Sequence, residues 1–215
     1  MPGKSLFVPV LNKTIVFCLL LSPFVRASDD SHYDDSQYKD SRTDVREFVA
    51  RGRVHVRMGV GDLRITRGDS TEIRLRYTVK SRRERNVKEA TVDFAVHGAD
   101  ANLEFHAPMG GSTNFDVELE VPENTNLDVH EKVGDMTVEQ VEGDKDLDLN
   151  VGDIRVTADR SKYSLVRAST SIGDVHGGDY GTTDGWLGKS LKYHGSGKYE
   201  LRAHVSVGDI SLEGK

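Results

Sequence analysis

The chain has 215 residues, 30% of them charged, and a formal net charge of −6 at pH 7. This acidity argues against binding to nucleic acid or to anionic membrane surfaces, since both attract basic proteins. The single cysteine, Cys18, lies near the N-terminus in a segment that we expect to be cleaved. The mature chain would then have no thiol, which excludes disulfides, thiolate metal sites and cysteine nucleophiles.

The first 27 residues have the features of a signal peptide. Two lysines supply a positive n-region, and an apolar stretch covers residues 15–25. Val25 and Ala27 then occupy the small-residue positions of a cleavage site. Removal of residues 1–27 takes away three positive charges and no acid, so the formal net charge moves from −6 to −9. We expect an exported protein, in the periplasm, at the cell surface or outside the cell, with no transmembrane segment after cleavage. An uncleaved anchor is the alternative.

The remaining chain divides into a polar segment and a patterned domain. Residues 28–45 are polar and charged, and such a segment cannot bury enough apolar surface to offset its ordering entropy, so we predict a disordered linker. From 46 to 215 apolar and polar residues alternate, most clearly over 73–79. A period of two places one face of a strand against a core and the other in water. The sequence therefore predicts one all-β domain over 46–215, with a charged loop or single turn at 82–90.

A Gly-Asp pair between two aliphatic residues recurs five times. The tetrapeptides are VGDL, VGDM, VGDI, IGDV and VGDI, and their glycines are Gly61, Gly134, Gly152, Gly173 and Gly208. Apolar residues occupy odd positions before each glycine, including the position just before it, and even positions after it. One straight strand would send half of these side chains into solvent. We therefore predict a corner at each pair, where glycine adopts a positive φ and aspartate accepts hydrogen bonds from backbone N–H groups.

The spacing of the pairs favours a stack of similar units. Gaps of 18 and 21 residues separate Gly134, Gly152 and Gly173, which suits a strand–corner–strand–corner unit laid on the next. Stacked about 4.8 Å apart with parallel hydrogen bonding, such units share a core of Val, Leu and Ile. The predicted fold is an all-β, β-solenoid or β-helix-like stack of short strands with Gly-Asp corners. An N-terminal strand meander would fill the long gap before Gly134, and a loop near 177–198 the gap before Gly208.

These features resemble the putative-adhesin domain family, an exported β-solenoid-like family of largely unknown function. The five tetrapeptides carry the resemblance, together with FDVELEVPENTNLDVHEKVGDMTV over 115–138. In that segment a strand ends at Val-Pro-Glu and the next strand leads into a Gly-Asp corner. The similarity covers about 46–215 and includes no catalytic motif. It implies an adhesion-like role and carries no functional residues across to this chain.

The corner aspartates are candidate metal ligands. Asp135, Asp144 and Asp153 lie nine residues apart, and stacked corners could bring their carboxylates together. Calcium prefers several oxygen ligands at about 2.3–2.6 Å. Alternatively each carboxylate caps its own turn, because the sequence lacks the extra glycines of calcium-binding β-roll repeats. We predict no bound cofactor, with calcium at these three residues as the alternative.

Aromatic residues mark the loop over 177–199. Tyr180, Trp186 and Tyr193 lie there among many glycines and are candidate ligand-binding residues. Exposed aromatic rings can stack on sugars or anchor a partner, although the loop could instead cover the end of the stack. The eight histidines form no zinc motif, so we interpret them as surface residues.

The sequence contains no Gly-x-Ser-x-Gly elbow and no Walker loop. The predicted function is therefore non-enzymatic: an exported cell-envelope scaffold or adhesin-like interaction module. Its partner would be a polysaccharide, an envelope protein or a second copy of the chain. The alternatives are a calcium-stabilised surface binding module and a carbohydrate-active hydrolase. The candidate carboxylates for the hydrolase are Asp116, Glu118, Glu120 and Asp128. Alternation along a strand explains these acidic residues equally well, because it turns every second side chain toward solvent.

Overall fold

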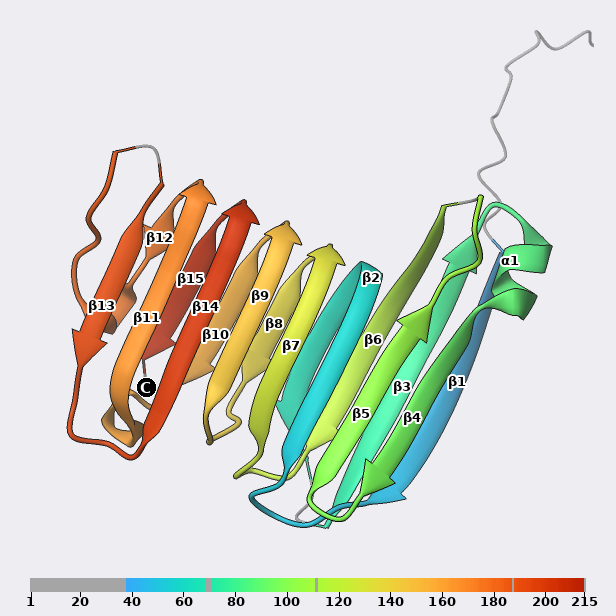
Figure 1. The fold of residues 1–215 in the computed structure, drawn as a ribbon, viewed down its shortest axis with the longest axis horizontal. Helices are drawn as coiled ribbons and strands as arrows, with labels where there is room; N and C mark the ends of the chain where they lie inside the picture. The colour runs from blue at the N-terminus through green and yellow to red at the C-terminus, as the bar shows by residue number, and fades with distance from the viewer. Residues whose placement is uncertain (1–37, 69–70, 111, 187, 215) are drawn as a thin grey trace, which may run out of the picture. The chain divides into compact units, whose positions relative to one another are not determined.

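In the computed structural model, residues 38–68, 71–110, 112–186 and 188–214 are described, and all belong to the compact unit Asp35–Lys215. This unit is all-β, which confirms the predicted class (Figure 1). Its strands are β1 (Tyr38–Glu47), β2 (Arg53–Arg67), β3 (Glu72–Ser81), β4 (Thr91–His97), β5 (Asp100–His106), β6 (Thr113–Val121), β7 (Asn126–Val133), β8 (Met136–Glu139), β9 (Lys145–Val151), β10 (Ile154–Ala158), β11 (Tyr163–Ile172), β12 (Val175–His176), β13 (Ser190–His194), β14 (Tyr199–Val207) and β15 (Ile210–Gly214).

Three short helical segments interrupt these strands. They are the α-helix α1 (Glu84–Glu89) and the 3-10 turns η1 (Arg160–Lys162) and η2 (Gly178–Tyr180). Helix α1 replaces the loop or single turn expected at 82–90, and its Val87 is buried. Among the described residues, no helix is long and apolar enough to span a membrane.

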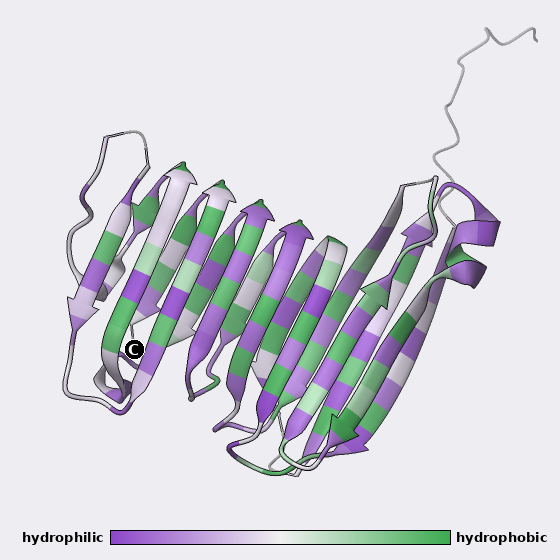
Figure 2. Ribbon diagram, viewed as in Figure 1, coloured by the Kyte–Doolittle hydropathy of each residue, from purple (hydrophilic) through white to green (hydrophobic). Residues whose placement is uncertain are grey.

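Strand β2 belongs to two layers of strands. Its residues up to Val60 pair with β5 on one side and β7 on the other. From Gly61 onward it pairs with β6 and β8. The front layer has the order β4-β5-β2-β7-β9-β14-β11-β13, and the back layer has the order β1-β3-β6-β2-β8-β10-β15-β12 (Figure 1). Hydrophobic and hydrophilic residues alternate along the strands (Figure 2), so the apolar faces of the two layers form the core between them.

Corners form where the Gly-Asp pairs pass from the front layer to the back layer. Strands β7, β9, β11 and β14 end just before the glycine, and β8, β10, β12 and β15 begin just after the aspartate. The four glycines at these corners have φ between 132° and 146°, whereas Gly61 lies inside β2 and does not have the positive φ predicted for it. A Cβ on Gly134 would lie 1.4 Å from the carbonyl oxygen of Gly61. Both the backbone conformation and the close approach therefore require glycine there.

The stacking order of the units differs from their order in the chain. Strand β14 lies between β9 and β11, and β15 lies between β10 and β12. The expectation that each unit lies on the preceding one is therefore wrong for the unit β11–β12, which lies beyond β14–β15 and does not pair with β9 or β10. The reason is that β13 pairs antiparallel with the outer edge of β11. The chain then returns to the inner edge of β11, where β14 completes the parallel ladder.

The residue before each glycine is not in the core, contrary to the sequence expectation. These side chains are 43% to 54% exposed, and they are Val60, Val133, Val151, Ile172 and Val207. Each lies at the last front-layer position before the corner. At this position the chain turns toward the back layer, so no back-layer side chain covers the aliphatic residue. The five residues together form an exposed aliphatic row.

Strand β1 overlaps the predicted linker. Residues 38–45 of the segment 28–45 are not disordered but form most of β1, which is antiparallel to β3. This pairing uses backbone groups and so does not require apolar side chains, while ion pairs of 2.8 Å join Asp40 to Arg42 and Asp44 to Arg46. Residues 28–37 and the predicted signal peptide, 1–27, lie outside the described residues.

Candidate binding surface

The outer face of the front layer centres on an aspartate between two histidines. Leu127 and Val129 face the core, so alternation along β7 turns Asp128 and His130 outward. The two oxygens of the Asp128 carboxylate lie 2.8 Å from Nδ1 of His55 and 3.1 Å from Nε2 of His130. One carboxylate thus holds two imidazole rings that come from neighbouring strands, β2 and β7.

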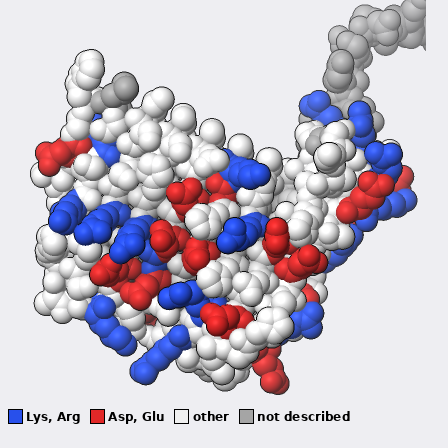
Figure 3. Space-filling view, in the orientation of Figure 1, with Lys and Arg blue, Asp and Glu red and all other residues white. Residues whose placement is uncertain are grey.

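A row of alternating polar groups extends from this cluster across the strands. Asp148 of β9 pairs in register with His130 on one side and with His204 of β14 on the other. The Nδ1 of His204 lies 3.1 Å from the Oγ of Ser169 on β11. Basic and acidic side chains are mixed over the same face (Figure 3). The face therefore offers hydrogen-bond donors and acceptors at the spacing of adjacent strands, about 4.8 Å.

Two grooves flank the histidine–aspartate cluster. The first, which Asp128 also lines, is bordered by Arg53, Asn126, Asp144, Asp146, Lys198, Glu200 and Arg202. The second, which His130 also lines, is bordered by Arg57, Glu104, His106, Lys132, Asp148 and Asn150. Because Asp128 and His130 lie two residues apart on one strand, the cluster separates the two grooves and contributes to both.

Each groove has a buried ionisable residue beneath it. Glu131 is 2% exposed, and neither of its carboxylate oxygens has a hydrogen-bond partner. Burial, assisted by the charges of Asp62 and Asp135, raises the pKa of Glu131 to about 8. Lys145 is also 2% exposed, and burial lowers its pKa to about 7. Sequence reasoning did not single out either residue, although Lys145 occupies a position that is apolar in the other units and Glu131 occupies one that is apolar in three of the other four.

The three calcium candidates do not converge. Asp135 and Asp153 occupy one row of corners, and each accepts a hydrogen bond from the backbone N–H of the aspartate in the next unit, at 3.1 and 2.9 Å. Asp144 precedes β9, whereas Asp153 follows it, so about 23 Å of strand separates them. Over the described ranges, no group of three or more His, Cys, Asp or Glu side chains could hold a metal ion. The carboxylates of Asp135 and Asp153 therefore cap the corner of the neighbouring unit rather than their own turn. Calcium binding stays a prediction.

The candidate hydrolase carboxylates lie on two different outer faces. Asp116, Glu118 and Glu120 project from β6 in the back layer, whereas Asp128 lies in the front layer. Arg76 of β3 forms ion pairs of 3.4 Å with Glu118 and 2.8 Å with Glu120. The structure therefore does not bring Asp128 together with the other three carboxylates.

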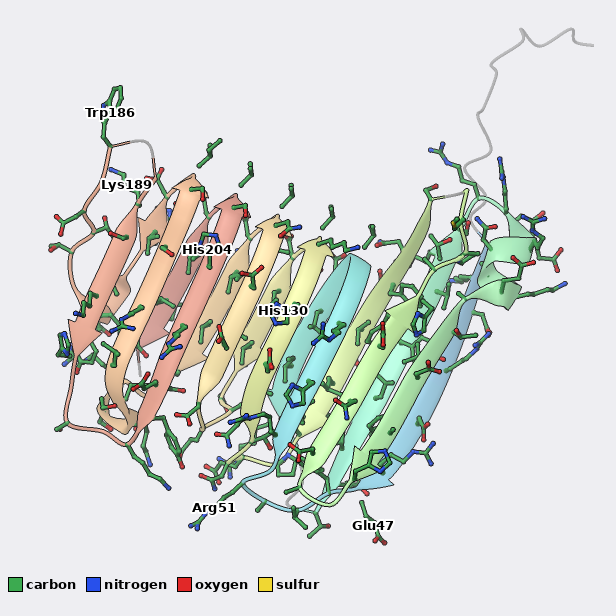
Figure 4. All side chains as sticks on the ribbon, viewed as in Figure 1. Glu47, Arg51, His130, Trp186, Lys189 and His204 are labelled. Carbon is green, nitrogen blue, oxygen red and sulfur yellow. The ribbon has the colours of Figure 1, made fainter. Side chains whose placement is uncertain are left out.

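The three candidate aromatic residues have different surroundings. Tyr180 is 4% exposed, and its hydroxyl donates a hydrogen bond of 3.1 Å to the carbonyl oxygen of Ala158. The ring of Tyr193 packs edge-on against Tyr180, with 5.5 Å between centroids. Trp186 is 96% exposed and projects from the loop (Figure 4). Tyr180 therefore belongs to the core, and of the three residues only Trp186 presents its whole ring to solvent.

Comparison with known proteins gives a fold likeness and no family assignment. No protein-family model matches the chain, and no curated protein sequence matches it. A putative cell adhesion protein from Clostridium sporogenes superposes with a TM-score of 0.53 and 14% identity, over 83% of this chain and 100% of that chain. A putative adhesin from Bacteroides fragilis gives a TM-score of 0.31 and 11% identity, over 80% and 97% of the two chains. The first likeness shows a shared fold.

Proposed function

We propose that this chain is an exported, non-enzymatic interaction module of the putative-adhesin type, and that its Gly-Asp units form a β-solenoid-like stack. The parallel register of β2, β7, β9, β14 and β11 supports a solenoid-like stack. The fold shared with a putative cell adhesion protein supports the adhesin-like role. The signal-peptide features of the sequence over residues 1–27 support export.

We further propose that the module binds an extended polysaccharide across the outer face of the front layer. The observation that carries this proposal is the position of His55, Asp128 and His130 between two grooves. A polysaccharide presents hydroxyl groups at regular intervals, and these require both donors and acceptors. Imidazole, carboxylate and guanidinium groups on adjacent strands supply both, and hydrogen bonds to charged groups are the stronger kind.

The test is a binding screen of the purified protein against polysaccharide classes, with two double variants. The front-layer variant His55→Ala/His130→Ala removes both imidazoles from Asp128. The control, Arg76→Ala/Glu118→Ala, removes an ion pair from the outer face of the back layer. We expect a polysaccharide that binds the wild type and the control equally and binds the front-layer variant at least about tenfold more weakly, a loss of about 1.4 kcal/mol.

Two outcomes would contradict this proposal. One is that no polysaccharide class binds, which would leave a protein partner as the ligand. The other is that the front-layer variant binds as well as the wild type, which would move the site elsewhere. Release of soluble sugar by the wild type would favour the hydrolase alternative.

A further inference from the structure

Strand β1 forms an edge of the back layer. It pairs with β3 along all ten of its residues, and within the described ranges no strand pairs with its other side. An unpaired edge exposes a row of N–H and C=O groups that can pair with another strand. Proteins commonly blunt such edges with charged side chains, especially lysines, and like charges placed directly opposite one another in two paired strands are destabilising.

The charges of β1 are of both signs, so a second copy in a suitable register meets opposite charges. The strand has three basic and three acidic residues, so its net charge is zero. Charged residues at equal distances on either side of Thr43 carry opposite charges. An antiparallel second copy centred on Thr43 would place opposite charges opposite one another, in the pairs Lys39 with Glu47, Asp40 with Arg46, and Arg42 with Asp44. Each pair would occur twice, once on either side of the twofold axis.

The same register also pairs the backbone N–H and C=O groups of the two strands. Side chains directly opposite in an antiparallel pair lie about 4.5–5.5 Å apart, and opposite charges there are stabilising. In this register an odd-numbered residue lies opposite an odd-numbered residue, and an even-numbered residue opposite an even-numbered one. Residues whose N–H and C=O groups point out of the edge therefore face each other and can exchange hydrogen bonds. The intrachain ion pairs Asp40–Arg42 and Asp44–Arg46 lie along the strand, and the groups of a second copy extend them into a network.

We propose that two copies of this protein associate by antiparallel pairing of β1 with β1, with the twofold axis at Thr43. The pairing joins the two back layers into one sheet and leaves the outer faces of the front layers free. It goes beyond the proposed function and does not depend on it. A ten-residue strand pair is about 34 Å long. Such an interface is small, which suits a weak, concentration-dependent dimer.

Cysteine cross-linking tests the register directly. In the Cys18→Ser background, Thr43→Cys places two thiols opposite each other on the axis, within the Cα separation that disulfides require. Ser41→Cys is the matched control, because Ser41 lies opposite Val45 and about 14 Å from its own copy. We expect oxidation to give a covalent dimer with Thr43→Cys and none with Ser41→Cys. Equal cross-linking of both, or cross-linking of neither, would overturn the proposal.

Charge reversal gives an independent measurement by sedimentation velocity. Asp40→Arg/Asp44→Arg makes the edge basic, and Arg42→Asp/Arg46→Asp makes it acidic. We expect the wild type to dimerise, each variant alone to be monomeric, and an equimolar mixture to dimerise again. A control outside β1 with the same change in net charge as the basic variant, Asp146→Arg/Asp148→Arg, should dimerise like the wild type. Dimers of either β1 variant alone, or failure of the mixture to dimerise although circular dichroism shows both variants folded, would contradict the pairing.

Discussion

The Nζ of Lys145 donates a hydrogen bond to the hydroxyl of Tyr163, and both side chains are buried between the two layers. In the neighbouring units the position of Lys145 is occupied by Leu127 and Leu201. Burial lowers the pKa of Lys145 to about 7 and raises the pKa of Tyr163. A polar pair therefore occupies a place in the core that aliphatic residues fill elsewhere.

We predict that Lys145 and Tyr163 are strongly coupled in stability. Lys145→Leu leaves the buried hydroxyl of Tyr163 without a partner, at a cost of about 1–3 kcal/mol. Lys145→Leu/Tyr163→Phe removes both polar groups, so it should recover that cost and be at least as stable as the wild type. Urea unfolding of both single variants and the double variant gives the coupling energy. Additive effects would contradict the coupling.

Lys145 should make the wild-type protein more stable as the pH rises. Its pKa is lower in the folded state than the ordinary value of 10.5, so the folded protein binds this proton less tightly. The contribution to stability is therefore full above pH 10.5 and is lost as the pH falls toward 7. In Lys145→Leu, the slope of the free energy of unfolding between pH 7 and pH 9 should decrease. An unchanged slope would show that Lys145 is not the titrating group.

Glu131 should make the protein less stable as the pH rises. Its folded-state pKa of about 8 lies above the ordinary value of 4.5, so its contribution is full below pH 4.5 and is lost as the pH rises through 8. Each pKa unit corresponds to about 1.4 kcal/mol. Glu131→Met, which copies Met58 of the adjacent strand, should remove a loss of a few kcal/mol between pH 5 and pH 8. The control is Glu118→Gln on the outer face of the back layer, which should keep the wild-type slope.

Gly152 should not tolerate alanine. Its φ is 132°, and a Cβ there would lie 1.7 Å from the carbonyl oxygen of Gly134. Gly152→Ala should therefore lower the free energy of unfolding by about 2 kcal/mol or more. Gly59→Ala is the control, because a Cβ on Gly59 has no atom within 4 Å. Equal stability of the two variants in thermal melts would contradict the corner argument.

Asp153 should act as a hydrogen-bond acceptor rather than as a calcium ligand. Its Oδ1 accepts a hydrogen bond of 2.9 Å from the backbone N–H of Asp209. Asp153→Ala should cost about 1 kcal/mol, while Asp153→Asn keeps an acceptor and should cost less. A chelator should leave the melting temperature of the wild type unchanged. A lower melting temperature with chelator, together with equal losses in both variants, would favour calcium.

Local features of the sequence determined the strand class and the corners. Alternation along β2, β3 and β6 requires one buried face, and this requirement is independent of which strand lies alongside. Gly134 has the positive φ predicted for the Gly-Asp pair, whereas Gly61 in the same motif does not, and Asp135 accepts its hydrogen bond from Asp153 of the next unit. Strand alternation and most of the corners could therefore be predicted without knowledge of the stacking order, but the hydrogen-bond donors to the corner aspartates could not.

The tertiary structure alone decided which strands are neighbours. The insertion of β14 between β9 and β11 depends on the hairpin from β11 to β13, and no local pattern encodes it. The meeting of His55 with Asp128 requires β2 and β7 to pair in one particular register across 73 residues of chain. The order in β1 likewise comes from the backbone of β3, because its own side chains bury little apolar surface. Periodicity fixes which face of a strand is buried, whereas long-range pairing fixes what lies beside it, and the candidate surface depends on the second.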